Sequence, residues 1–142
     1  MKVALIIGHN SRSKGAYSSI IGSEFDYWKR IAMKIKTIIP GVVDVYERSP
    51  NKYYTREMFQ VLEELNQFEY DFCLELHFNS SIDKSANGCE CYIYHKNNKA
   101  KMLATNFMHQ LHNIFNVKIR NNHGINLVSS SQVRGGYGIC KS

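Results

Sequence analysis

The stretch KVALIIGHN, residues 2–10, decides the fold of this chain. Its apolar run over residues 3–7 is continuous, which is typical of a strand covered on both faces of a parallel sheet. The run is too short for a secretory leader, it stops at His9, and no small-residue cleavage site follows it. We therefore expect a buried first strand, in a protein that is synthesised in the cytoplasm without a signal peptide.

Strand and helix patterns alternate along the rest of the sequence. Apolar residues recur at steps of three and four in three segments, and each segment predicts a helix. The first helix is expected over residues 23–39, the second begins after an N-cap at Thr55, and the third covers residues 103–114. Short strands are expected at residues 42–46, 70–78 and 88–95, with weaker signals at 125–128 and 137–140. This alternation predicts one α/β domain over residues 1–142, with a mostly parallel, mixed and twisted sheet and helices on both faces.

The composition narrows the class of protein. Apolar residues make up 44% and charged residues 21%, which excludes a largely disordered chain, and no stretch approaches the ~20 apolar residues of a membrane helix. The net charge of +6 favours anionic partners such as nucleic acid, acidic lipid or cell-wall polymers. The basic residues are scattered and form no nucleic-acid-binding motif, so we expect no nucleic-acid partner and no membrane insertion. The cysteines form no Cys-x-x-Cys pair and are expected to be free thiols: Cys73, Cys89, Cys91 and Cys140.

Three polar side chains are expected at one edge of the sheet. His9 directly follows the first strand, His77 lies near the end of the third, and Glu24 opens the first helix. Ligands of open α/β sheets gather beyond the carboxyl ends of the strands, and two imidazoles with one carboxylate are typical of a catalytic zinc site. Each residue also has an ordinary explanation, since histidines occur in loops and cores and a glutamate is favoured at a helix start by the helix dipole. His95 and His123 are competing ligand candidates.

Several motifs in this order resemble a known family. They are IIGHN at residues 6–10, Glu24 at the start of a helix, ELHFNS at residues 75–80 and GCECYIY at residues 88–94. Together they are similar to the zinc-dependent N-acetylmuramoyl-L-alanine amidases of the third amidase type, which occur in bacterial autolysins and phage endolysins. The resemblance extends from Lys2 to about Ser142.

The resemblance implies a set of functional residues and a substrate. By that match His9, Glu24 and His77 are the zinc ligands, and Asn79 is a substrate contact. The implied substrate is the amide between muramic acid and L-alanine in bacterial peptidoglycan. The phage branch looks closest, which implies an endolysin that acts on the cell wall after release through a holin.

The sequence departs from the family at its C-terminal end. In the family a catalytic glutamate follows a segment similar to residues 136–140, and this sequence stops at Ser142, so we expect a truncated domain that lacks one strand. Such a chain is expected to cleave its substrate about 10²–10⁴-fold more slowly and to associate with itself through an exposed sheet edge. Glu75 and Glu90 are candidate substitutes for the acid/base, and Glu75 could instead orient a metal ligand. The alternative function is an inactive relative that binds zinc or muropeptides.

Overall fold

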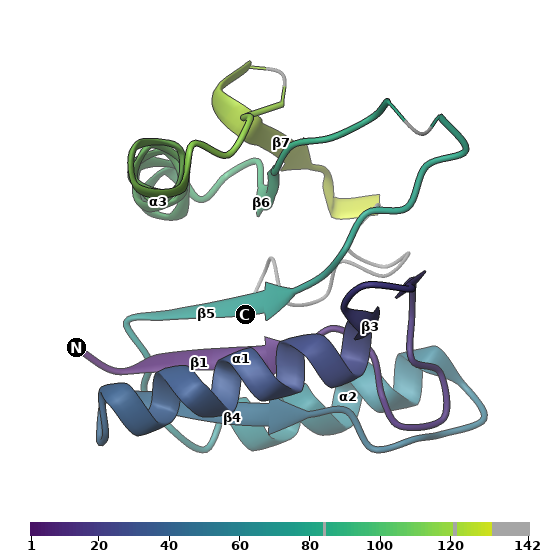
Figure 1. The fold of residues 1–142 in the computed structure, drawn as a ribbon. Helices are drawn as coiled ribbons and strands as arrows, with labels where there is room; N and C mark the ends of the chain where they lie inside the picture. Colours follow the sequence, from purple (N-terminus) through teal and green to yellow (C-terminus); the bar gives the residue numbers. More distant parts are fainter. Residues whose placement is uncertain (84, 121, 132–142) are drawn as a thin grey trace. The chain divides into compact units, whose positions relative to one another are not determined.

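The continuous apolar run near the N-terminus forms the central strand β1 (Val3–Ile7) in a computed structural model of the chain (Figure 1). All of its residues are buried. β1 lies between β4 (Val43–Glu47) and β5 (Phe72–Leu76), and both neighbours run parallel to it. The predicted parallel arrangement is confirmed, and the carboxyl ends of all three strands lie at the same edge.

The structure describes residues 1–83, 85–120 and 122–131. The strand predicted at residues 137–140 lies outside the described residues, as does Cys140. The chain divides into two compact units, the first of residues 1–80 and the second beginning at Ser81, and each is described by itself. The single domain expected over residues 1–142 stays a prediction.

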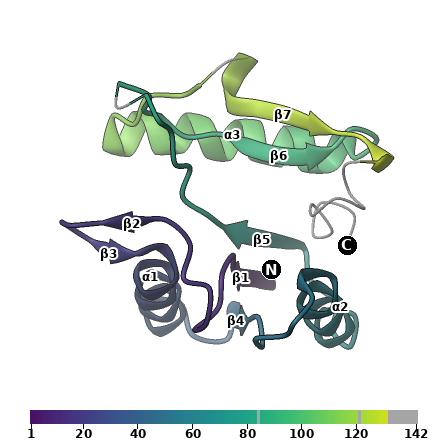
Figure 2. The ribbon, with the colours of Figure 1, turned by 90° about the vertical axis from the view of Figure 1, so that its right-hand side faces the viewer.

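Two helices cover the sheet of the first unit, one on each face (Figure 2). α1 (Glu24–Ile38) packs Phe25 and Ala32 against the face that carries Leu5. α2 (Tyr54–Leu65) covers the other face and buries Met58, Val61 and Leu65. Their buried residues recur at the three- and four-residue steps found in the sequence, because this spacing keeps apolar side chains on one side of a helix. The α/β fold class with helices on both faces is confirmed.

The start of α1 is fixed by a side-chain cap. A short antiparallel hairpin, β2 (Tyr17–Ser18) and β3 (Gly22–Ser23), leads into the helix. The Ser23 hydroxyl accepts a hydrogen bond from the backbone N–H of Asp26 at 3.2 Å and donates to the Asp26 carboxylate at 2.6 Å. This cap makes Glu24 the first residue of the helix, so its side chain is held by the geometry of the helix start.

The start of α2 differs from the prediction. Thr55 was expected to be the N-cap, but this is wrong, because the helix begins at Tyr54 and Tyr53 is the N-cap. The side chain of Tyr53 makes no capping hydrogen bond. A carboxylate farther along the helix, that of Glu57, instead accepts the backbone N–H of Asn51 at 2.8 Å and ties the incoming loop to α2.

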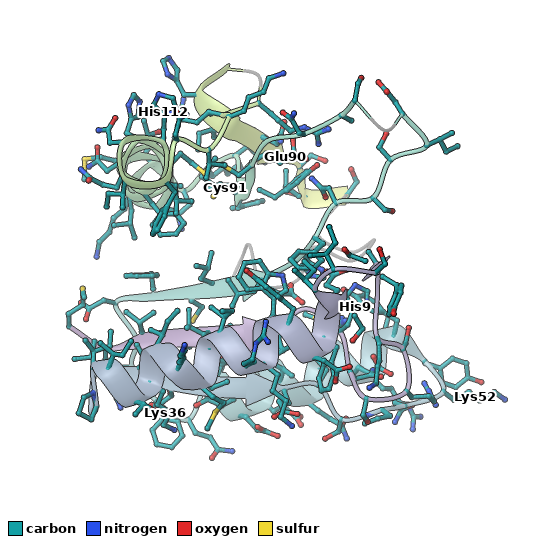
Figure 3. The ribbon with its side chains drawn as sticks, viewed as in Figure 1. His9, Lys36, Lys52, Glu90, Cys91 and His112 are labelled. Atoms are coloured by element: carbon teal, nitrogen blue, oxygen red, sulfur yellow. The ribbon has the colours of Figure 1, made fainter. Side chains whose placement is uncertain are left out.

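The second unit contains a smaller α/β arrangement. β6 (Cys91–Tyr94) and β7 (Ile125–Val128) run parallel, α3 (Asn98–Phe115) packs on them, and η1 (Asn122–Gly124) leads into β7. Ile93, Met108 and Ile125 form its core, and Figure 3 shows Cys91 between β6 and α3. The free thiols expected at Cys73, Cys89 and Cys91 are confirmed. Among the described residues, no helix is both long and apolar enough to cross a membrane.

Replacing the capping serine tests whether it holds the start of α1. Ser23→Ala removes the acceptor for the Asp26 N–H, so we expect the free energy of unfolding to fall by about 1 kcal/mol. Urea unfolding followed by circular dichroism measures this loss. Ser19→Ala, in the exposed hairpin loop, is the matched control and should change the unfolding free energy by less than about 0.5 kcal/mol. Equal stabilities for the two variants would contradict the cap.

Candidate functional site

Three polar side chains meet at the carboxyl edge of the sheet in the first unit. His9 follows β1, Glu24 is the first residue of α1, and His77 follows β5. One potential ligand atom from each lies within 4.8 Å of those from the other two. Figure 3 shows His9 at this edge, near the start of α1, whereas Lys36 lies toward the opposite end of the helix. The structure therefore brings together the three side chains that the sequence singled out.

The carboxylate of Glu24 is the centre of this group. It is only 2% exposed, and its Oε1 atom lies 3.3 Å from Nε2 of His9 and 3.0 Å from Nδ1 of His77. The backbone N–H of Phe78 donates to the same oxygen at 2.7 Å, and the N–H of Ala16 donates to Oε2 at 3.0 Å. These donors compensate for the removal of a carboxylate from water.

The same contacts set the protonation of the three groups. Burial opposes the charged form of Glu24, but the contact with His77 and two backbone hydrogen bonds outweigh it and lower the pKa of this carboxyl. Desolvation likewise opposes a charged His77, yet Glu24 and Glu75 raise its pKa to about 9. The pKa of His9 is lowered, mainly by desolvation. Glu24 is thus ionised, and it contacts two imidazoles of which His77 is the stronger base and His9 the weaker.

Two glycines have no side chain where the imidazoles and the carboxylate lie, and this gives those groups their space. A Cβ atom added at Gly8 would lie 2.3 Å from Cε1 of His77. At Gly15, whose φ is +73°, it would lie 2.5 Å from both Oε2 of Glu24 and Cδ2 of His9. The imidazoles and the carboxylate therefore pack directly against backbone.

This donor set fits a divalent transition metal. Two imidazole nitrogens and one carboxylate oxygen match the three protein ligands of catalytic zinc sites, whose fourth position is left for water or substrate. Within residues 1–83, 85–120 and 122–131, no other group of three or more His, Cys, Asp or Glu side chains is close enough to hold an ion. His9, Glu24 and His77 are thus the residues that could hold a metal.

A second buried carboxylate, that of Glu57, binds the loop that follows His9, and it was not predicted from the sequence. Asn10 is 1% exposed, and its Nδ2 atom donates to Oε2 of Glu57 at 2.8 Å. The Asn10 Oδ1 atom accepts the backbone N–H groups of Arg12 and Ser13 at 3.0 and 2.9 Å. Arg12 also lies 3.3 Å from Glu57. These bonds hold the loop that follows His9.

A buried pair of charged residues, Arg48 and Glu75, lies next to His77. Nη1 of Arg48, which follows β4, lies 3.9 Å from Oε1 of Glu75 on β5. The same oxygen lies 3.3 Å from Nε2 of His77. Arg48 was not predicted, because a charged residue at a strand end is ordinarily exposed.

The other residues that were predicted to be functional do not belong to the group of His9, Glu24 and His77. Asn79 is exposed two residues after His77, and its substrate contact stays a prediction. In the second unit, Glu90 accepts hydrogen bonds from Arg120 at 3.1 Å and Asn126 at 2.8 Å. The competing histidines also lie there: Nδ1 of His95 is 3.1 Å from the Val128 carbonyl oxygen, and the His123 ring stacks on His109 at 5.8 Å.

Comparison with known proteins gives one family. The family described as N-acetylmuramoyl-L-alanine amidase matches residues 3–134. A search of curated proteins found no match. The matched range runs from β1 through β7 and includes His9, Glu24 and His77.

The glycine that faces two of these side chains can be tested by substitution. Gly15→Ala places a Cβ against Glu24 and His9 in addition to the strain of its positive φ. Gly41→Ala is the matched control, because its φ is +79° but nothing lies within 4 Å of the added Cβ.

We expect Gly41→Ala to lose about 1–2 kcal/mol of unfolding free energy from the backbone alone, and Gly15→Ala to lose more. Gly15→Ala should also weaken zinc binding, whereas Gly41→Ala should not. Urea unfolding in metal-free buffer and zinc titration measure the two effects. Equal stability losses with unchanged zinc affinity would show that the site is not packed against this glycine.

Proposed function

The chain belongs to the N-acetylmuramoyl-L-alanine amidase family, which makes it a peptidoglycan amidase, and we propose that its activity depends on zinc held by His9, Glu24 and His77. The bond cleaved is the amide between N-acetylmuramic acid and L-alanine. The observation that carries the proposal is the convergence of one carboxylate and two imidazoles at the carboxyl edge of a parallel sheet, all within the range that the family matches. Asn79, exposed near His77, is proposed as a substrate contact.

The chain's own residues are arranged to hold a metal. When bound, zinc lowers the pKa of a water molecule and polarises the carbonyl of the scissile amide. Glu24 is fixed by the backbone N–H groups of Ala16 and Phe78, so its carboxylate cannot turn away to solvent. The two imidazoles are fixed by their contacts with this carboxylate and by the backbone of Gly8 and Gly15. A ligand set held in this way would offer a bound metal the same three protein atoms in one fixed arrangement.

The positive charge of the chain is opposite to that of the polymers that surround the substrate in the cell wall. Its net charge of +6 favours approach to anionic cell-wall polymers, because opposite charges raise the rate of encounter. A role as a phage endolysin is part of this proposal and stays a prediction.

A non-hydrolysing relative that binds zinc or muropeptides is the second candidate. Departure of the L-alanine amine requires a group that donates a proton to it. The two described carboxylates that contact His77 face charged or titratable groups of the protein, since Glu24 contacts both imidazoles and Glu75 lies near His77 and Arg48. This observation favours binding without fast turnover, and the assay below separates the two functions.

The ligand set can be tested by metal content and hydrolysis. We expect one zinc per chain in the parent protein and less than a tenth of that in His9→Ala, Glu24→Ala and His77→Ala, because three protein ligands hold the ion. Metal analysis after dialysis measures the zinc. His112→Ala, an exposed histidine whose Nδ1 contacts the Val117 carbonyl oxygen, is the control and should keep its zinc.

Hydrolysis is measured as the release of L-alanine amino termini from purified peptidoglycan. Release that stops on chelation and in each ligand variant supports the amidase. Zinc and peptidoglycan binding without release would support the second candidate. Full zinc in Glu24→Ala together with none in His77→Ala would contradict this ligand set.

A further inference from the structure

Glu75 occupies a position in the sheet where an apolar side chain would be expected. It pairs in register with Ile6 of β1, which is fully buried, and its own side chain is only 13% exposed. Removing a carboxylate from water is unfavourable unless charged or hydrogen-bonding groups surround it. Two ion-pair partners reach its carboxylate, Arg48 at 3.9 Å and His77 at 3.3 Å.

Arg48 is held in place from the α2 side. Its side chain is 3% exposed, its guanidinium lies 5.0 Å from the centre of the Tyr54 ring, and Nη1 donates to Sδ of Met58 at 3.3 Å. These partners are neutral and cannot balance a buried cation, and the nearby negative charge is that of Glu75, 3.9 Å away. Arg48 is thus positioned as the counter-charge of Glu75.

His77 lies between two carboxylates. Nδ1 faces Glu24 at 3.0 Å, and Nε2 faces Glu75 at 3.3 Å. Among the described residues, no hydrogen-bond partner with good geometry meets Oε1 of Glu75 or Nε of Arg48, although both atoms are buried. Buried acceptors without a hydrogen bond are rare and call for an explanation.

Metal binding through Nδ1 supplies that explanation. A neutral imidazole that gives Nδ1 to a metal carries its proton on Nε2, and this proton then points to Oε1 of Glu75. A small rotation of the ring would close the hydrogen bond and satisfy the buried oxygen. We propose that Arg48 and Glu75 are positioning residues, which hold the His77 ring with Nδ1 toward the metal and Nε2 toward the Glu75 carboxylate.

This proposal rests on the proposed zinc function and assigns Glu75 a role other than acid/base. The two nitrogens of an imidazole point away from each other, and Glu75 is on the Nε2 side, away from Glu24 and His9. A carboxylate behind a metal-bound histidine fixes the ring orientation and its tautomer. Arg48 pairs with that carboxylate at 3.9 Å and holds it in place, so it acts on the metal through Glu75.

Zinc affinity of the full chain tests the proposal. Dissociation constants are measured by competition with a chromophoric chelator for the parent protein, Glu75→Gln, Arg48→Met and the double variant. We expect Glu75→Gln to weaken zinc binding about 10–100-fold, the range for outer-sphere partners of metal-bound histidines. Arg48→Met should weaken binding in the parent background and add nothing in the Glu75→Gln background, because its effect passes through Glu75. Glu47→Gln, which removes a carboxylate that pairs with Lys29, is the matched control and should leave zinc affinity unchanged.

Two further measurements separate positioning from a general loss of structure. Glu75→Asp retains the carboxylate and should bind zinc more tightly than Glu75→Gln, while far-ultraviolet circular dichroism establishes that each metal-free variant is folded. In the zinc-loaded parent protein, nitrogen-15 spectra of histidine should show His77 metallated at Nδ1 and protonated at Nε2. The Nε2 proton should exchange faster with water in Glu75→Gln, because an amide oxygen is a weaker acceptor than a carboxylate.

The possible results are distinct. A parent protein that binds no zinc contradicts the proposed function itself. Zinc binding by Glu75→Gln within twofold of the parent value would overturn the positioning role, and loss of hydrolysis at unchanged affinity would make Glu75 a catalytic residue. Metallation of His77 at Nε2 would also overturn the proposal.

Discussion

The carboxyl edge of the central sheet depends on the burial of one carboxylate, that of Glu24. At 2% exposure it must receive its hydrogen bonds from the protein, and its partners come from separate parts of the first unit: His9 after β1, Ala16 before the hairpin, and His77 and Phe78 after β5. Folding therefore draws these segments together whether or not a metal is present. The arrangement of His9, Glu24 and His77 is a consequence of satisfying one buried charge.

The carboxylate of Glu57 binds the loop after β1 from the other face of the sheet. His9 contacts Glu24 at the start of α1, while its neighbour Asn10 donates to Glu57 of α2. Two consecutive residues of the loop after β1 are thus bound to two helices that cover opposite faces of the sheet. This arrangement explains why a buried asparagine follows the histidine, since an apolar residue there would leave Glu57 without one of its donors.

The sequence predicted the three side chains of the candidate metal site and named Glu75 as a residue that could orient one of them, but it did not predict Arg48 or Glu57. His9, Glu24 and His77 could be found because the ends of buried strands and the start of a helix can be recognised from hydrophobic periodicity. Arg48 and Glu57 could not, because periodicity assigns charged residues to the surface and their partners are distant in sequence. The error at Thr55 has a similar cause, since the side chain that binds the incoming loop comes from the next turn of α2.

The order of the strands explains the glycine that precedes the first histidine. Arg48 follows β4 and Glu75 lies on β5, so β1 runs between the two halves of this charged pair. The His77 ring lies against β1 where that strand ends, and a Cβ at Gly8 would approach Cε1 of His77 to 2.3 Å. Any other residue at this position would push the ring away from both Glu24 and Glu75. Gly8 and His9 therefore serve one site in different ways: the glycine leaves space for one imidazole, and the next residue supplies the other.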